Sequence, residues 1–243
     1  MAAAIAALPQ DPAGFSDGFE SATTVAWDRV VGERGRTVTR GAALTGAFGL
    51  RVRTGRRPAY VVDELAAATS TYRPPWRMRM DGLRSEGAAV LTLRVVDASG
   101  RRLLEVCVRT VRGAGFVRLG TAGGDTPWRP LPAGAPGLEL STGAGGATLA
   151  VDGVVVGTGP PLAAPASAVR LGAVTGTDAY GPVAFDDAPS LRRGPRGREV
   201  GPLRRRTSQT RPDARSGRTM ALGADVAHPE PGRPRPAAPE LPC

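Results

Sequence analysis

The sequence predicts an all-β protein, a two-sheet antiparallel sandwich with a disordered C-terminal tail. Short runs of alternating apolar and polar residues recur about every 10–15 residues, and Gly, Pro or Asp-Gly closes each run. No helical period is sustained between the runs, which excludes alternating strands and helices. The pattern stops at Arg193, so residues 1–13 are assigned to an N-terminal extension, 14–193 to the sandwich and 194–243 to the tail.

The first part of the sandwich is expected to contain short strands with one buried face each. A short helix over residues 62–68, or over the first eight residues, is the only helical alternative. In the last strand of this part, aromatic residues and methionines stand at even spacing, which indicates a core face. The expected strands are Phe15–Glu20, Trp27–Val31, Gly49–Arg53, Ala59–Val62 and Tyr72–Met80.

The middle of the chain is expected to form hairpins. Asp152-Gly153 stands between two β-branched runs and favours a type I′ turn, because both of its residues accept a positive φ. Two further turns, at Asp97–Gly100 and Gly113–Gly115, predict an antiparallel meander in the middle of one sheet. The strands expected here and beyond are Ala89–Val96, Leu103–Val111, Phe116–Leu119, Gly137–Leu140, Thr148–Val151, Val154–Gly157, Val169–Val174 and Val183–Phe185.

The positive charge is concentrated at the C-terminal end. Residues 1–190 carry 20 arginines against 17 acidic residues, whereas residues 191–243 carry 12 against 5. The chain contains no lysine, which is typical of a GC-rich genome, so the net charge of +10 is not read as a signature of nucleic-acid binding.

Residues 194–243 contain nine prolines and no aromatic residue, so they cannot bury enough apolar area to fold alone. The run Leu203–Arg206 would permit non-specific contact with an anionic polymer, such as nucleic acid or cell wall. No aromatic side chain is available there for base stacking. A shifted-frame or readthrough extension is the alternative origin of this composition.

Cys107 and Cys243 show neither a disulfide framework nor metal-ligand spacing, and both are expected to be free thiols. No apolar run reaches the length of about 18 residues that a transmembrane helix needs. The N-terminus lacks the basic segment of a signal peptide. We therefore expect either that the chain is not exported or that its true start lies upstream.

Several segments occur in an order known from one family. Asp17–Ser21, Trp27-Asp28 and Ala43–Val52 open the region, and Val169–Gly172, Gly181 and Phe185–Asp187 close it, with Gly137–Leu140 and Val151–Gly153 between them. Residues 14–193 thereby resemble the concanavalin A-like and laminin-G-like jelly-roll modules of bacterial proteins. The family normally has an aromatic residue after the two closing aspartates, where this chain has Ala188.

The resemblance implies a jelly-roll sandwich of one convex and one concave sheet. Its members bind carbohydrate, act as adhesion or spacer modules, or hydrolyse polysaccharide. It also implies an extracellular or cell-surface location, although no signal peptide is visible in the sequence.

No catalytic residues are expected. A glycosidase needs two carboxylates about 5–10 Å apart, and the strand Leu103–Val111 offers only Glu105, Cys107 and Arg109 on its non-core face. The single histidine, His228, lies in the tail, which excludes a Ser/His or Cys/His nucleophile in the sandwich.

An arginine-rich binding face is expected on the non-core sides of consecutive strands. The guanidinium groups of arginines on this face would recognise an anionic or hydroxyl-rich glycan through bidentate hydrogen bonds. The alternative is cross-strand Arg–Glu pairing on a solvated face. An aromatic platform for a sugar would have to come from Tyr72 or Trp76, whose spacing also fits a core face. The candidate ligand-binding residues are Arg77, Arg79, Arg94, Glu105, Arg109 and Arg118.

A calcium site is expected where the first and last strands meet. Asp17 and Glu20 would face Asp186 and Asp187 if the terminal strands pair, and clustered carboxylates suit Ca²⁺. Related jelly-roll modules carry a structural calcium in a similar place. Surface carboxylates capped by arginines are the alternative.

Three functions are compatible with these observations. The first is a non-catalytic carbohydrate-binding or adhesion-type module. The second is a structural spacer or assembly module that contacts another protein, and the third is a degenerate or cryptic polysaccharide hydrolase.

Overall fold

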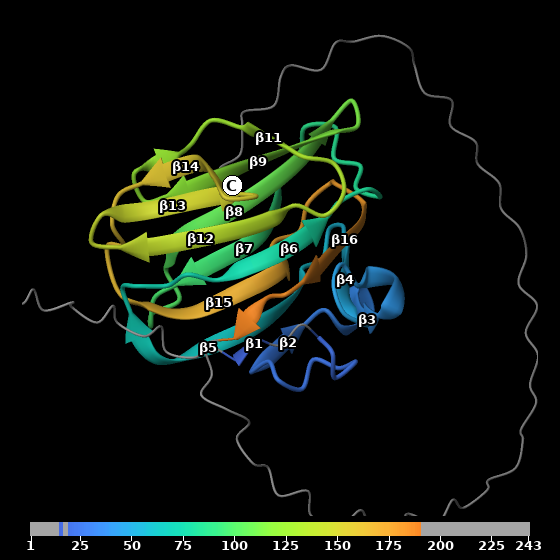
Figure 1. Ribbon diagram of the computed structural model, residues 1–243, viewed down its shortest axis with the longest axis horizontal. Coiled ribbons are helices and arrows are strands. Elements are labelled where there is room, and N and C mark those ends of the chain that lie inside the picture. Colours follow the sequence, from blue (N-terminus) through green and yellow to red (C-terminus); the bar gives the residue numbers. More distant parts are fainter. Residues whose placement is uncertain (1–14, 17–18, 191–243) are drawn as a thin grey trace, which may run out of the picture. The chain divides into compact units, whose positions relative to one another are not determined.

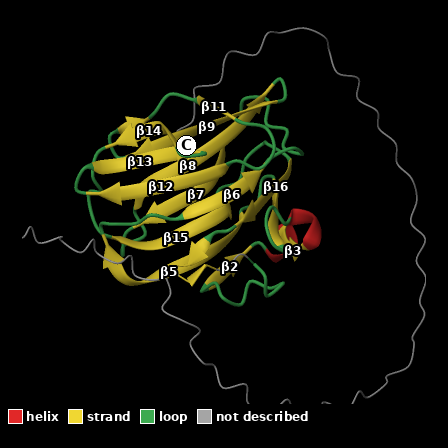
Figure 2. Cartoon of the chain, viewed as in Figure 1, coloured by secondary structure: helices red, strands yellow, loops and turns green. Residues whose placement is uncertain are grey.

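The computed structural model describes residues 15–16 and 19–190, which form two antiparallel β-sheets packed face to face (Figures 1 and 2). This confirms the predicted all-β sandwich. The larger sheet contains β2 (Arg29–Val31), β5 (Ala59–Thr69), β7 (Val90–Val96), β8 (Arg102–Val111), β9 (Ala114–Thr121), β10 (Gly124–Asp125), β11 (Arg129–Leu131) and β15 (Ala166–Ala173).

The smaller sheet lies in front of the larger one in Figure 1. Its strands are β3 (Arg36–Thr39), β4 (Gly49–Thr54), β6 (Pro75–Arg79), β12 (Gly137–Gly143), β13 (Gly146–Val151), β14 (Val154–Gly159) and β16 (Gly181–Asp186). Two single-turn 3₁₀ helices, η1 (Glu33–Gly35) and η2 (Arg40–Ala42), flank β3.

In both sheets, some strands that follow one another in the chain do not lie side by side. The larger sheet runs β10-β9-β8-β7-β15-β5-β2, with β11 also paired to β9, and the smaller runs β14-β13-β12-β6-β16-β4-β3. The meander β7-β8-β9 thus lies toward one edge of the larger sheet, whereas the β13–β14 hairpin is at the edge of the smaller one. The predicted antiparallel meander is confirmed, whereas its place in the middle of the sheet was wrong, because period-two alternation does not specify which strands lie beside one another.

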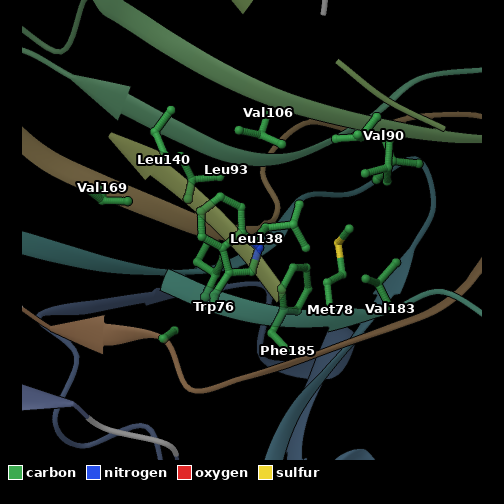
Figure 3. Close-up of a cluster of buried hydrophobic side chains, with 14 of the residues drawn as sticks. Trp76, Met78, Val90, Leu93, Val106, Leu138, Leu140, Val169, Val183 and Phe185 are labelled. Carbon is green, nitrogen blue, oxygen red and sulfur yellow. The ribbon is translucent and has the colours of Figure 1, made fainter. Parts of the chain in front are cut away.

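The core is built from the inward-facing residues of both sheets (Figure 3). On β6, Trp76 and Met78 are buried, while Arg77 and Arg79, which alternate with them, face outward, as the pleat of a strand requires. Tyr72 is also buried, and burial raises the pKa of its hydroxyl far above the ordinary value. Tyr72 and Trp76 are therefore core residues, not a platform for sugar.

Turn residues explain where the hairpins reverse. Asp152 and Gly153 have φ values of 48° and 79°, which confirms the predicted type I′ pattern. Between β8 and β9 the turn is formed by Arg112 and Gly113, with φ values of 52° and 80°, and not by Gly113–Gly115. Two consecutive residues with positive φ complete this turn, so Ala114 already begins β9.

Strand β5 extends to Thr69, through the residues for which a short helix was the alternative. Its pairing with β15, for example Val62 with Arg170 and Glu64 with Ala168, overrides the local helical propensity. Gly172 permits this pairing, because its φ is +136° and an added Cβ would lie 2.5 Å from the carbonyl oxygen of Ala59.

A further antiparallel pair joins β1 (Phe15–Ser16) to β17 (Pro189–Ser190), so the first and last strands meet as expected. The predicted N-terminal extension and tail lie outside the described residues. Within the part of the chain that the structure describes, no helix is long and apolar enough to cross a bilayer.

Candidate functional site

Four of the predicted ligand-binding residues meet on the outer face of the larger sheet. Arg94 on β7 pairs directly with Glu105 on β8, and Cys107 pairs with Arg118 on β9. Arg109 lies two residues further along β8, so its side chain faces the same way. We call this surface, which also includes the residues added below, the outer face of the larger sheet.

Glu105 is a fully buried carboxylate held by two arginines. Nε of Arg94 donates to its Oε1 at 2.7 Å, and Nη1 of Arg102 donates to its Oε2 at 2.9 Å. The side chain of Glu105 is 0% exposed, against 22% for Arg94. This is the cross-strand Arg–Glu pairing that the sequence left as an alternative, and it occupies both carboxylate oxygens.

An aromatic residue that the sequence did not single out completes the surface. Trp128, just before β11, has the guanidinium carbon of Arg109 at 4.3 Å and that of Arg118 at 4.6 Å from its ring centroid. Both distances lie within the range of cation–π attraction. Nη2 of Arg118 also bonds Oδ2 of Asp125 at 2.9 Å, which fixes this arginine between the ring and a carboxylate.

The two arginines on Trp128 retain unused hydrogen-bonding capacity. Nε of Arg109 and Nε of Arg118 are buried and have no hydrogen-bond partner within the described residues. Buried donors of this kind are rare in folded proteins and indicate a missing acceptor. Within the same residues, Arg109 and Arg170 take part in no ion pair.

The outer face of the larger sheet therefore has excess positive charge. Arg170 stands on β15 beside Arg94 and lies 5.9 Å from the ring centroid of Tyr60. Three acids face six arginines, a net charge of +3. The acids are Glu64, Glu105 and Asp125, and the arginines are Arg29, Arg94, Arg102, Arg109, Arg118 and Arg170.

Beside these charges lies an apolar floor of Leu91, Cys107 and Val174, against which Tyr60 and Trp128 pack. Cys107 is disulfide-bonded, which corrects the expectation of a free thiol; its partner lies outside the described residues. Its side chain lies on the outer side of β8, in register with Leu91 and Arg118.

Arg77 and Arg79 do not join this surface, although the sequence grouped them with it. Both lie on β6 of the smaller sheet. Nε of Arg77 is 3.4 Å from Oδ2 of Asp187, and Nη2 of Arg79 donates to the carbonyl oxygen of Gly41 at 2.8 Å. The expectation failed because β6 is followed by a chain crossing into the other sheet, which alternation along a strand cannot reveal.

Two of the four predicted calcium ligands, Asp186 and Glu20, accept backbone N–H groups, whereas Asp187 accepts the Thr45 hydroxyl and pairs with Arg77. Both oxygens of the buried Asp186 accept N–H groups: Oδ2 accepts those of Leu44 and Thr45 at 2.7 and 2.9 Å, and Oδ1 accepts that of Asp187 at 2.8 Å. Glu20 similarly accepts the N–H of Ala47 at 3.0 Å. These bonds pin the loop between η2 and β4 to the last strands.

The described residues contain no group of three or more His, Cys, Asp or Glu side chains arranged to hold a metal ion. Asp17 lies outside them, so a site that includes it stays a prediction. Neither Asp186 nor Glu20 needs a cation to satisfy its oxygens, because N–H donors already do so.

Two carboxylates do approach each other on the outer face of the larger sheet. Glu105 and Asp125 both pair with Gly120 of β9, one from each side. Their Cα atoms are thus two strand spacings apart, about 10 Å. Each carboxylate is bound by at least one arginine, so neither is placed as a free acid or base in this arrangement.

The sequence pattern did not identify Trp128 and Asp125 as site residues. The neighbouring strands β10 and β11 have only two and three residues, which is too short to show an alternating pattern. The available signal was local. Trp128 lies between Pro127 and Arg129 in a loop, where an isolated tryptophan cannot belong to the alternating core face of a strand.

No protein-family model matches this sequence, and no curated protein matches it. Among solved structures, one called a sialidase aligns with a TM-score of 0.53 and 13% identity over 73% of this chain. The cellulose induced protein Cip1 aligns at 0.45 and 15% over 72%, and the alginate lyase AlyA1 from Zobellia galactanivorans at 0.42 and 12% over 59%. The alignments cover 18%, 95% and 77% of those three chains.

This chain thus spans about a fifth of the sialidase, with 18% of that protein covered. At such identities the similarity concerns the fold alone. It supports the two-sheet jelly-roll sandwich that the strand order shows.

Proposed function

We propose that this chain is a non-catalytic carbohydrate-binding module that recognises an acidic polysaccharide on the outer face of the larger sheet. The observation that carries the proposal is the contact of Arg109 and Arg118 with Trp128, beside buried Nε donors for which the described part of the chain offers no acceptor. Such a module acts outside the cell or at its surface, where polysaccharides of this kind occur.

The chemistry of the face selects the ligand. Guanidinium groups bind carboxylates and sulfates through two parallel hydrogen bonds, and each charge-assisted bond contributes about 1.5–3 kcal/mol. Arg109 and Arg170 are free of ion pairs within the described residues, so an anionic sugar does not have to displace an internal carboxylate. A neutral glucan would leave the excess charge uncompensated, which favours an acidic ligand.

Binding without turnover is supported by the state of the two acids. Glu105 is fully buried and held by Arg94 and Arg102, and Asp125 is held by Arg118. A general acid or base needs a carboxyl group that contacts the substrate.

Affinity electrophoresis of the full-length chain tests the proposal, with alginate and heparin as acidic probes and amylose as a neutral one. We expect retardation by the acidic probes only, and binding weaker by at least about a hundredfold after Arg109→Gln with Arg170→Gln, because two charge-assisted contacts are lost. Arg56→Gln with Arg57→Gln is the matched control, since it removes two equally charged, exposed residues of the β4–β5 loop.

Two results would overturn the proposal. One is an absence of binding to any acidic polysaccharide. The other is equal weakening in both double variants, which would assign the binding to overall charge and not to this face. Release of new chain ends from any probe, abolished by Glu105→Gln, would replace the binding module with the hydrolase that the Glu105–Asp125 spacing leaves as the second candidate.

A further inference from the structure

A disulfide-bonded cysteine lies in the middle of the proposed binding face. Cys107 is on the outer side of β8, in register with Leu91 on one neighbouring strand and with Arg118 on the other. The chain contains one other cysteine, Cys243, which lies outside the described residues. Within one chain the bond can only join these two residues.

The bond determines where Cys243 is held. Disulfide-bonded residues have their Cα atoms about 4.4–6.8 Å apart. The inner side of β8 is filled by core residues such as Val106 and Val108, so a residue bonded to the outward-facing Cys107 lies over the outer face. Residues 191–242 precede Cys243 and would span about 170 Å if fully extended, so chain length does not restrict the bond.

The two arginines without an internal ion pair lie on opposite sides of this point. Arg170 on β15 is in register with Arg94 and, through it, with Glu105, whereas Arg109 lies four residues beyond Glu105 on β8. Strands β8 and β15 are two spacings apart, so the Cα atoms of Arg109 and Arg170 are separated by about 17 Å along a diagonal. An extended ligand that binds both arginines must follow this diagonal.

Leu91 lies midway along the diagonal. It belongs to β7, the strand between β8 and β15, and it pairs with Cys107 at a Cα distance of about 5 Å. Leu91 and Cys107 are 1% and 0% exposed although both belong to the outer face, and the rings of Tyr60 and Trp128 pack against the cluster that they form. A residue bonded to Cys107 therefore lies on the path of such a ligand.

We propose that the Cys107–Cys243 disulfide controls access to the outer face of the larger sheet. The oxidised chain holds residue 243 on the path between Arg109 and Arg170, and reduction of the bond clears that path. This rests on the proposed function and adds regulation to it. In the oxidised chain each arginine is still reached from its own side, so binding of an acidic polysaccharide is weakened and not lost.

The reductant is a dithiol. Its thiolate attacks one sulfur of the bond, which forms a mixed disulfide and releases the other cysteine as a thiol. The second thiol of the reductant then attacks its own sulfur in the mixed disulfide and releases the remaining cysteine. Two electrons and two protons pass from the dithiol to Cys107 and Cys243, and the dithiol leaves as a cyclic disulfide.

Peptide mapping and affinity electrophoresis of the full-length chain test the proposal. Tryptic digestion without reductant is expected to give the peptide that contains Cys107 joined to the one that contains Cys243, and dithiothreitol is expected to separate them. Alginate should bind at least about tenfold more tightly after reduction, because one further charge-assisted contact is made. Cys243→Ser should bind with the higher affinity without reductant and should not respond to it.

Two controls separate a blocked path from a general effect on the fold. Glucuronate is a single sugar that contacts one arginine at a time, so it should bind the oxidised and reduced chains within twofold of each other. Far-ultraviolet circular dichroism should show the same β-sheet signal in both forms and in Cys243→Ser.

Each outcome decides the proposal. A missing joined peptide, equal affinity of the oxidised and reduced chains for alginate, or tighter binding by the oxidised chain would overturn the control of access and leave the proposed function in place. Unfolding of both the reduced chain and Cys243→Ser, or an equal gain in glucuronate affinity, would assign the bond to stability of the face and overturn it as well. Absence of alginate binding by either folded form would overturn the proposed function itself.

Discussion

Arg94 stabilises a carboxylate that has no access to water, and its replacement by methionine measures that contribution. Methionine keeps the apolar stem of Arg94 but removes the group that bonds Oε1 of Glu105 at 2.7 Å. Because Glu105 is 0% exposed, its charge cannot regain hydration without opening β8. Arg102 still holds the other oxygen at 2.9 Å, so the carboxylate keeps one partner.

Removing one partner of a buried ion pair lowers the free energy of unfolding by about 3–5 kcal/mol. Because Arg102 still pairs with Glu105, we expect Arg94→Met to lie at the lower end of that range, about 3 kcal/mol. For a folded unit of this size, that corresponds to a fall in melting temperature of about 6–12 °C. Arg94→Met combined with Glu105→Leu replaces the pair by apolar groups and is expected to recover to within about 1 kcal/mol of the unsubstituted chain.

Urea unfolding followed by tryptophan fluorescence gives these free energies, and calorimetry gives the melting temperatures. Arg56→Met is the control, because its ion pair with Asp178 is about nine-tenths exposed and contributes little. The reasoning is refuted if Arg94→Met lowers the free energy of unfolding by less than about 1 kcal/mol, or if the double variant is as unstable as the single one.

Two further predictions concern the backbone and pH. Gly172→Ala is expected to lower the free energy of unfolding in urea by about 3 kcal/mol, since the added Cβ would collide with the backbone of β5 at a positive φ. Gly143→Ala, with open space around the residue, should change stability little. Equal losses in the two variants would contradict the close approach at Gly172. The Ser99 hydroxyl, as the largest cause, lowers the pKa of Asp97. The ionised Asp97 therefore stabilises the fold above the unfolded-state pKa of about 4, and this stabilisation is lost as the pH falls through the lower pKa of the folded state. Asp97→Asn should flatten the fall in melting temperature between about pH 5 and 3. Parallel pH profiles of the two proteins would exclude this role.

Strand positions were predictable because alternation is a local property. Leu103–Val111 was expected from its pattern and is found as Arg102–Val111, and the Asp152-Gly153 turn follows from two residues that tolerate positive φ. The partners of each strand were not predictable. Arg79 and Arg94 show the same outward alternation, yet their strands belong to different sheets.

The arginine-rich character and the jelly-roll sandwich follow from the order of residues along the chain, because composition and period-two patterning act over short distances. The binding surface depends on long-range pairing. Trp128 reaches Arg109 and Arg118 only because β11 folds back onto β9, and the predicted arginine face divides into two because β6 joins the smaller sheet. Contacts between strands distant in sequence are selected by packing over the whole core, which no local pattern encodes.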